Sequence, residues 1–201
     1  VANQINKIIK NKKVNYAWIG SGYDPDNDYD VSLWLKDQIE KSGLEDKLII
    51  LDNSDIYSKL IERSDIFLVT SRLDPLPNVA IDALSEGTPV FCFESACGIA
   101  DVMNESNLLK TSLVAPYLES NKMSEQICRL LEDNKLYSQV SDTCKKLARS
   151  IFSMDNYIAE LEKIGYEAVD YQNQINNDYE YLKNKIKINQ ENCKENRIYL
   201  T

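Results

Sequence analysis

Short apolar runs alternate with helical patterns over the first 115 residues, and no other feature limits the fold as strongly. Strands that alternate with helices form parallel sheets, because a crossover helix returns the chain to the same edge. Ile66–Val69 is apolar throughout, as expected of a strand covered on both faces. The sequence therefore predicts an α/β fold with a doubly wound parallel sheet. The predicted strands are 14–19, 48–51, 66–70, 90–93 and 112–115, and the predicted helices between them are 1–12, 33–39, 56–63 and 77–85, with Ser42-Gly43 as a C-cap.

From Ser124 onward the pattern becomes helical, with three successive apolar stripes that end at Ile164. Residues 166–201 are rich in Asn, Lys, Glu and Tyr and show no sustained apolar period, which favours a helical or flexible extension or a linker. We therefore expect a domain over residues 1–165, ending near Gly165, followed by the extension 166–201.

The composition argues against several classes of function. A formal net charge of -9 disfavours nucleic-acid binding, which depends on clustered Lys and Arg. The lack of histidine excludes a Ser-His-Asp or Cys-His pair within the chain and any His-containing metal site. The five cysteines are odd in number and none forms a C-x-x-C pair, so reduced, buried thiols are expected and no metal site is indicated.

The chain carries no pattern of a membrane or secreted protein. No apolar run approaches the roughly 20 residues that span a bilayer. Residues 1–4 lack the charged-then-apolar pattern of a signal peptide. These observations predict a cytoplasmic domain, and a start at Val1 inside a helical pattern favours a fragment of a longer protein.

The segment 70–90 carries the strongest functional pattern: a strand, a proline-rich turn and a helix. Asp74 precedes Pro75 and is therefore held extended, and Pro77 suits a first helical turn, where its missing N–H is not needed. The free N–H groups of residues 78–80 can then point at an anion. A helix that begins at the carboxyl end of a strand is a suitable diphosphate site.

Two carboxylates flank this predicted phosphate site. Asp82 lies one turn further along the helix, where it can accept hydrogen bonds from the hydroxyls of a ribose. Asp74, on the preceding turn, can reach hydroxyls of a transferred sugar. The segment is thus suited to a nucleoside diphosphate sugar.

The segment resembles the donor-binding motif of glycosyltransferase family 4, whose members carry two carboxylates separated by seven residues. Asp74 and Asp82 match this spacing, although both are glutamate in most of the family. Ser71-Arg72 before the first carboxylate and the turn 87–90 match in order. So do Ala96-Cys97-Gly98 and the following Asp101. The resemblance covers residues 16–164.

The resemblance implies a Rossmann-like domain, the C-terminal half of a GT-B enzyme. Gly20 and Gly22 would let the backbone approach the donor, and Asn78 and Val79 would offer N–H groups to its phosphates. Cys97 and Gly98 would border the sugar. Ser71, Arg72 and Pro77 complete the implied binding set, and Asp74 and Asp82 would be the catalytic pair.

The resemblance also implies an activity. It is retaining transfer from a UDP- or GDP-sugar, with no obligatory metal or other cofactor, to a glycan or lipid-linked acceptor held by a missing N-terminal half. Synthesis of bacterial surface polysaccharide, with peripheral association at the inner face of the membrane, follows as a further expectation.

One departure supports an alternative function. Family members open this half with a glycine-rich turn carrying an Arg and then a Lys to the diphosphate, and this basic pair lies before the given sequence. We expect the chain alone to bind donor weakly and not to turn over. The alternative is a non-catalytic, degenerate GT-B-like module that binds or scaffolds within a larger protein.

Simpler interpretations exist for single residues. Asp74-Pro75 fits an ordinary loop turn, and Asp82 fits a favourable acid near a helix N-terminus. Arg72 fits an ion pair with a neighbouring acid as well as it fits a phosphate contact. Cys92 and Cys97 are expected to be packing residues, and the aromatic side chains Trp18 and Trp34 are assigned to the core.

Two other classes of protein fit less well. A receiver-like signalling domain needs a lysine after a late strand, where this chain has Glu94-Ser95. A sugar-nucleotide epimerase of the same architecture needs further ionisable groups around the sugar, including histidine, which the chain lacks.

Overall fold

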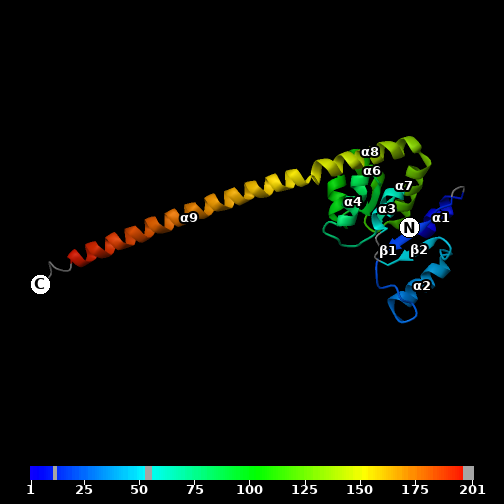
Figure 1. Cartoon of the computed structure of the whole chain (residues 1–201), viewed down its shortest axis with the longest axis horizontal. Helices are drawn as coiled ribbons and strands as arrows, with labels where there is room; N and C mark the ends of the chain where they lie inside the picture. The colour runs from blue at the N-terminus through cyan, green and yellow to red at the C-terminus, as the bar shows by residue number, and fades with distance from the viewer. Residues whose placement is uncertain (11–12, 53–55, 197–201) are drawn as a thin grey trace. The chain divides into compact units, whose positions relative to one another are not determined.

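The computed structural model describes residues 1–10, 13–52 and 56–196, and places Val1–Ile151 and Phe152–Thr201 in two compact units. The first unit is an α/β domain with parallel sheets, and the second contains one long helix, α9 (Met154–Asn196) (Figure 1). The predicted α/β class with a helical tail is therefore confirmed. The boundary expected near Gly165 falls within α9, and residues 11–12 of the predicted first helix lie outside the described residues.

A two-stranded parallel sheet forms the first part of the domain. It contains β1 (Tyr16–Ile19) and β2 (Leu48–Leu51), paired from Tyr16 opposite Leu48 to Ile19 opposite Leu51. α2 (Val31–Lys41) lies between these two strands in the chain, whereas α1 (Ala2–Ile8), which precedes β1, packs against α7 (Ser120–Glu132). The predicted C-cap is confirmed, because Ser42 caps α2 and Gly43 has a φ of 61°.

A three-stranded parallel sheet forms the second part, in the order β3 (Phe67–Val69), β4 (Val90–Phe93), β5 (Val114–Ala115). The predicted strand 112–115 is wrong in its first half. Ser112 and Leu113 end helix α6, because Leu113 packs into the core with Leu109, one turn earlier. The helices that accompany this sheet are α3 (Tyr57–Arg63), α4 (Asn78–Glu86), α5 (Gly98–Met103) and α6 (Asn107–Leu113).

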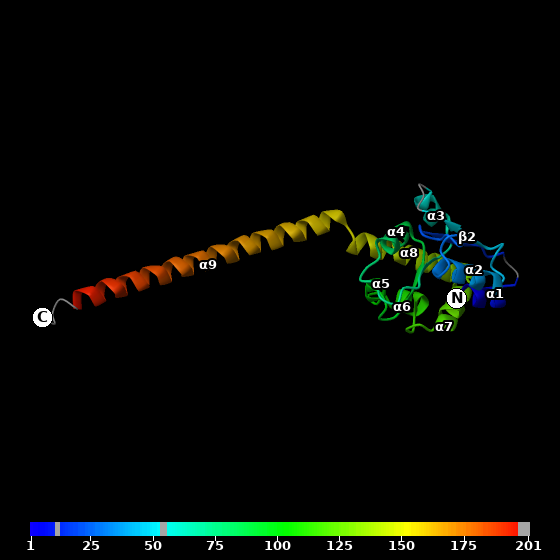
Figure 2. The ribbon, with the colours of Figure 1, turned by 90° about the horizontal axis from the view of Figure 1, so that it is seen from below.

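The core of the domain surrounds β4. All four residues of this strand are buried, so helices must cover both faces. The apolar run Ile66–Val69 predicted the same burial for the neighbouring strand, where only Val69 is buried and the other three residues are half-buried. α4 packs against β3 and β4, while α6 and α7 (Ser120–Glu132) pack against β4 and β5. α8 (Asn134–Ile151) packs against α4 (Figure 2). The largest fully buried side chains are Phe91, Ile5, Leu84, Ile99, Met103, Leu109, Leu113, Met123, Ile127, Leu130, Val90 and Val140.

The two tryptophans do not belong to this core, contrary to the expectation from sequence. Trp18 in β1 is 54% exposed and Trp34 in α2 is 62% exposed. Ile49, in the neighbouring strand β2, is exposed as well. The β1–β2 sheet thus leaves apolar side chains exposed on both faces, since Ile49 pairs with Ala17 and not with Trp18, and aromatic content alone could not distinguish these positions from the core.

The C-terminal end of α4 is fixed by a glycine. Gly87 has a φ of 86°, its N–H donates to Leu84 O, and the next N–H, of Thr88, donates to Ala83 O. Ser141 Oγ of α8 donates to Gly87 O over 2.6 Å. The buried Thr88 Oγ1 donates to Ile61 O at the end of α3. These bonds fix α4 relative to both neighbouring helices.

We predict that Gly87→Ala lowers the free energy of unfolding by about 1–2 kcal/mol, because an L side chain is strained at positive φ. An added Cβ would also lie 3.0 Å from Ser141 Oγ. Urea unfolding followed by circular dichroism measures the change. The same substitution at Gly165, where nothing lies within 4 Å of an added Cβ, is the control and should stabilise α9 by about 0.5–1 kcal/mol. Equal effects at both sites would contradict the prediction.

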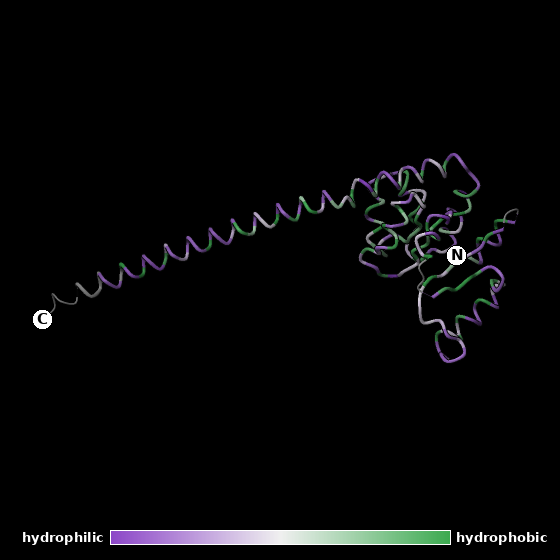
Figure 3. Tube along the Cα trace, viewed as in Figure 1, coloured by the Kyte–Doolittle hydropathy of each residue, from purple (hydrophilic) through white to green (hydrophobic). Residues whose placement is uncertain are grey.

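Helix α9 differs from the first unit in having no buried side chains among those described. Its described side chains, through residue 188, are all exposed, and polar and apolar residues intermix along it (Figure 3). Within the described part of the chain, no helix is long and apolar enough to cross a membrane.

Candidate functional site

The loop after β3 and the loop after β4 are joined by backbone hydrogen bonds. Asp74 N–H donates to Ala96 O over 2.9 Å, and Asp74 forms an isolated parallel bridge with Cys97. Gly98 N–H is shared between Asp74 O at 3.2 Å and Pro75 O at 3.0 Å. Both loops follow the carboxyl ends of adjacent parallel strands, which is where ligands of such sheets bind. The structure thus brings Asp74, Cys97 and Gly98 together.

The close approach of these loops requires glycine at position 98. A Cβ placed there would overlap the carbonyl oxygen of Pro75 and lie 3.2 Å from its carbonyl carbon. Both partners are backbone atoms, so no side-chain rotation relieves the contact. Glycine is required here because a side chain has no room, and not because of the backbone conformation, since Gly98 does not have a positive φ.

The N-terminus of α4 begins directly after this turn. Pro77 is its N-cap residue, with extended backbone angles and no capping side chain. Ala80 N–H donates to Pro77 O over 3.0 Å, which corrects the expectation that all N–H groups of residues 78–80 are free. Within the part of the chain that the structure describes, the N–H groups of Asn78 and Val79 have no partner. Two donors are therefore available to an anion.

Asp82 points toward helix α3. Tyr57 Oη donates to Asp82 Oδ2 over 3.4 Å. Burial, followed by the charge of Asp82 and this hydrogen bond, raises the pKa of Tyr57 to about 12, so the phenol stays a donor near neutral pH. Sequence reasoning missed Tyr57, because it lies 25 residues before Asp82 and no local pattern links the two.

The glycine turn after β1 is held by α2. Gly20 N–H donates to Leu51 O over 2.9 Å, and Gly22 has a φ of 98°. Ser32 Oγ, which is buried, donates to Gly22 O and accepts from Asp24 N–H. No hydrogen bond joins this turn to the Asp74 loop or to α4 among the described residues. The sequence did not single out Ser32, whose role depends on how α2 folds back.

Ser71 and Arg72 lie exposed at the start of the Asp74 loop. Within the described ranges no acid lies close enough to form an ion pair with Arg72, so the surface ion pair considered above is not formed. The described residues also contain no group of three or more Cys, Asp or Glu side chains that could hold a metal ion.

Cys92 and Cys97 form a buried thiol pair beside Asp74. The pKa of Cys97 is lowered to about 7, first by the hydrogen bond from the Cys92 thiol and then by the N–H groups of Ala100 and Ile99. The same hydrogen bond, together with burial, raises the pKa of Cys92. Both side chains are buried, as expected of packing residues, but Cys97 also places an ionisable sulfur near Asp74.

We predict that thiolate absorbance titrates with a midpoint near pH 7, that Cys97→Ala removes this step, and that Cys92→Ala moves it to higher pH.

The folded-state pKa of Cys97, about 7, lies below its ordinary value of 9.0. Ionisation therefore stabilises the fold fully above pH 9.0, and this contribution is lost as the pH falls through about 7. Relative to Cys97→Ala, the free energy of unfolding should rise from pH 7 to pH 9.0; a flat difference would contradict the assignment.

Solved structures confirm the fold. TarM from S. aureus, in complex with Fondaparinux, alpha-GlcNAc-glycerol and UDP, has a TM-score of 0.65 and 18% identity over 81% of this chain and 30% of its own. HepE from Anabaena, in complex with UDP and glucose, has a TM-score of 0.63 and 20% identity over 81% of this chain and 44% of its own. These neighbours are GT-B glycosyltransferases, so the predicted half of a GT-B fold is confirmed.

Sequence comparison agrees with the fold. An uncharacterized glycosyltransferase of Haemophilus influenzae is 22% identical over 150 residues, which are 75% of this chain and 39% of the relative. The chain thus spans less than half the length of that relative. The family model "Glycosyl transferases group 1" matches residues 2–147, which include the Asp74 loop, α4 and the Cys97–Gly98 loop. The chain therefore belongs to the group 1 family of glycosyl transferases.

Proposed function

We propose that this chain is the donor-binding domain of a retaining glycosyltransferase, which transfers a sugar from a nucleoside diphosphate sugar to a glycan or lipid-linked acceptor. The observation that carries the proposal is the junction of the Asp74 turn with the Cys97–Gly98 loop, directly before the N-terminus of α4. At the carboxyl ends of β3 and β4, this junction brings together the hydrogen-bonded turn that carries Asp74 and the N-terminus of α4. Among the described residues, the N–H groups of Asn78 and Val79 are the two free donors there.

The diphosphate binds at the N-terminus of α4 in this proposal. The N–H groups of Asn78 and Val79 donate to phosphate oxygens, and the helix dipole adds a favourable positive potential. This suits a chain with a net charge of -9, because backbone donors provide attraction without basic side chains. Arg72, exposed and without an ion-pair partner in the described part, adds charge that stabilises the leaving diphosphate.

The ribose binds at Asp82. Tyr57 donates to one carboxylate oxygen, which holds the side chain and leaves the other oxygen to accept from ribose hydroxyls. Most of the family has glutamate at this position, which is longer than aspartate by one methylene. The hydrogen bond from Tyr57 offsets this difference, because a fixed carboxylate loses less conformational entropy on binding than a free one. Gly20 and Gly22, at the end of β1, are proposed to border the donor on the opposite side.

The transferred sugar binds between Asp74 and the Cys97–Gly98 loop. The hydrogen bonds from Asp74 N–H and Gly98 N–H fix the backbone of this turn, so the residue that carries the carboxylate is positioned for sugar hydroxyls. Ser71 and Pro77 complete the turn on either side of Asp74. UDP is the favoured nucleotide, because UDP is named for both TarM and HepE. Action at the inner face of a bacterial membrane in surface polysaccharide synthesis remains an expectation from the family.

The test is calorimetric titration of the chain with UDP, GDP, 2′-deoxy-UDP and a panel of UDP- and GDP-sugars. We predict selective binding of one nucleotide. Asp82→Ala should weaken it about tenfold, through loss of a hydrogen bond to a charged group. The loss should be much smaller for the 2′-deoxy nucleotide, which lacks one of the hydroxyls.

Asp142→Ala is the matched control, because Asp142 is an exposed aspartate within helix α8 that takes no part in the proposed site. Its affinity for the nucleotide should equal that of the native chain. Equal weakening by both variants would refute the assignment of Asp82. Absence of binding from folded native chain would instead favour the degenerate, non-catalytic module.

A further inference from the structure

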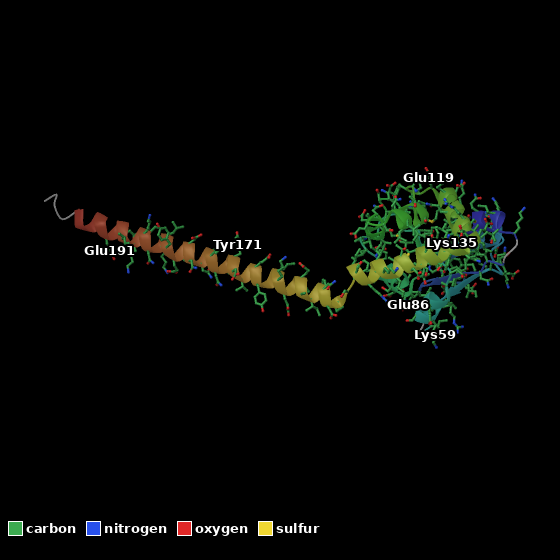
Figure 4. The ribbon with its side chains drawn as sticks, turned by 90° about the horizontal axis from the view of Figure 1, so that it is seen from above. Lys59, Glu86, Glu119, Lys135, Tyr171 and Glu191 are labelled. Carbon is green, nitrogen blue, oxygen red and sulfur yellow. The ribbon has the colours of Figure 1, made fainter. Side chains whose placement is uncertain are left out.

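The described side chains of helix α9 are exposed. It contains 43 residues, and its side chains project on all sides, with Tyr171 and Glu191 as markers of its length (Figure 4). In proteins most helical stability comes from packing of an apolar face. Large apolar side chains are nevertheless frequent on α9, and they are between 43% and 74% exposed.

Most of these side chains form a continuous seam with coiled-coil spacing; Ile158, Tyr166, Val169, Tyr181 and Ile188 lie outside it. Successive members are separated by alternating steps of three and four residues, as in a heptad repeat. The alternation changes once, where a step from Tyr171 to Ile175 is followed by a second step of four to Tyr179. Such a stutter unwinds a coiled coil locally and does not end it. The seam consists of Met154, Tyr157, Leu161, Ile164, Ala168, Tyr171, Ile175, Tyr179, Leu182 and Ile186.

We propose that α9 pairs with α9 of a second copy of this chain as an antiparallel two-stranded coiled coil with Ile175 at the two-fold axis. In this register Tyr171 faces Tyr179 of the second copy, Ala168 faces Leu182, and Ile164 faces Ile186. Each of these facing pairs, which we call a layer, then joins an a position of one helix to a d position of the other. In these central layers the small Ala168 lies opposite the larger Leu182, and the tyrosines pair with each other across the axis.

The charges of α9 favour a second copy in this orientation. Residues 155–170 contain five acids and one lysine, whereas three lysines occur at residues 183, 185 and 187. A parallel pair would place the two acidic stretches side by side. An antiparallel pair places each acidic stretch beside the lysines of the other copy, with Glu167 and Lys185 flanking the seam as an interhelical ion pair on both sides of the axis.

The first experiment measures the mass of the full chain by light scattering and sedimentation over a wide range of concentration. The proposal predicts a dimer, twice 23.0 kDa, that dissociates on dilution. A monomer throughout the range would overturn it. So would a trimer or tetramer, since the register allows only two helices.

Two matched variants test the seam. Ile175→Asp places a charge at the centre of the interface and should raise the dimer dissociation constant on the order of a hundredfold or more. Tyr166→Asp places the same side chain on the opposite face of α9, where the native residue is 74% exposed, and should leave the dissociation constant unchanged. Equal effects of the two substitutions would show that the seam is not the interface.

Charge exchange tests the orientation. Glu167→Lys and Lys185→Glu, studied separately, should each weaken the dimer by roughly fivefold to tenfold. A mixture of the two variants should form heterodimers of native strength, because every flanking pair is then of opposite charge. If mixing gives no recovery, the antiparallel register is wrong.

Discussion

The hydrogen-bonded contact between the Asp74–Pro75 turn and the Ala96–Gly98 loop is the interaction on which the site depends. It joins the loops that follow the carboxyl ends of β3 and β4, directly before α4 and at the start of α5. Only a residue without a Cβ permits it, because the carbonyl of Pro75 occupies the space beside Gly98. The geometry of the proposed donor site is therefore set by backbone packing, before any charged side chain contributes.

The rest of the domain holds this contact in place. β4 is buried on both faces and anchors one loop, while α4 is fixed at its far end by Gly87, Ser141 and Thr88. Rigid elements on both sides mean that the N–H groups at the start of α4 keep their direction without a capping side chain. Pre-organised donors of this kind lose little entropy on ligand binding, which suits the proposed binding of a diphosphate by an acidic chain.

Local patterns predicted the alternating strands and helices, and they identified the strand, turn and helix around Asp74 that the structure brings against Cys97 and Gly98. They could not predict features that depend on distant residues. Tyr57 meets Asp82 only because α3 packs beside α4, and the exposure of Trp18 depends on which elements pack against its two-stranded sheet. The seam of α9 was missed for another reason: a stutter at Ile175 hides its period from a short window.

A crystal structure of the chain with UDP bound tests the central claim most directly. The account predicts that the diphosphate accepts hydrogen bonds from the N–H groups of Asn78 and Val79 at about 3 Å, and that the ribose hydroxyls donate to Asp82. A nucleotide bound away from the N-terminus of α4, with these two N–H groups still unpaired, would contradict it.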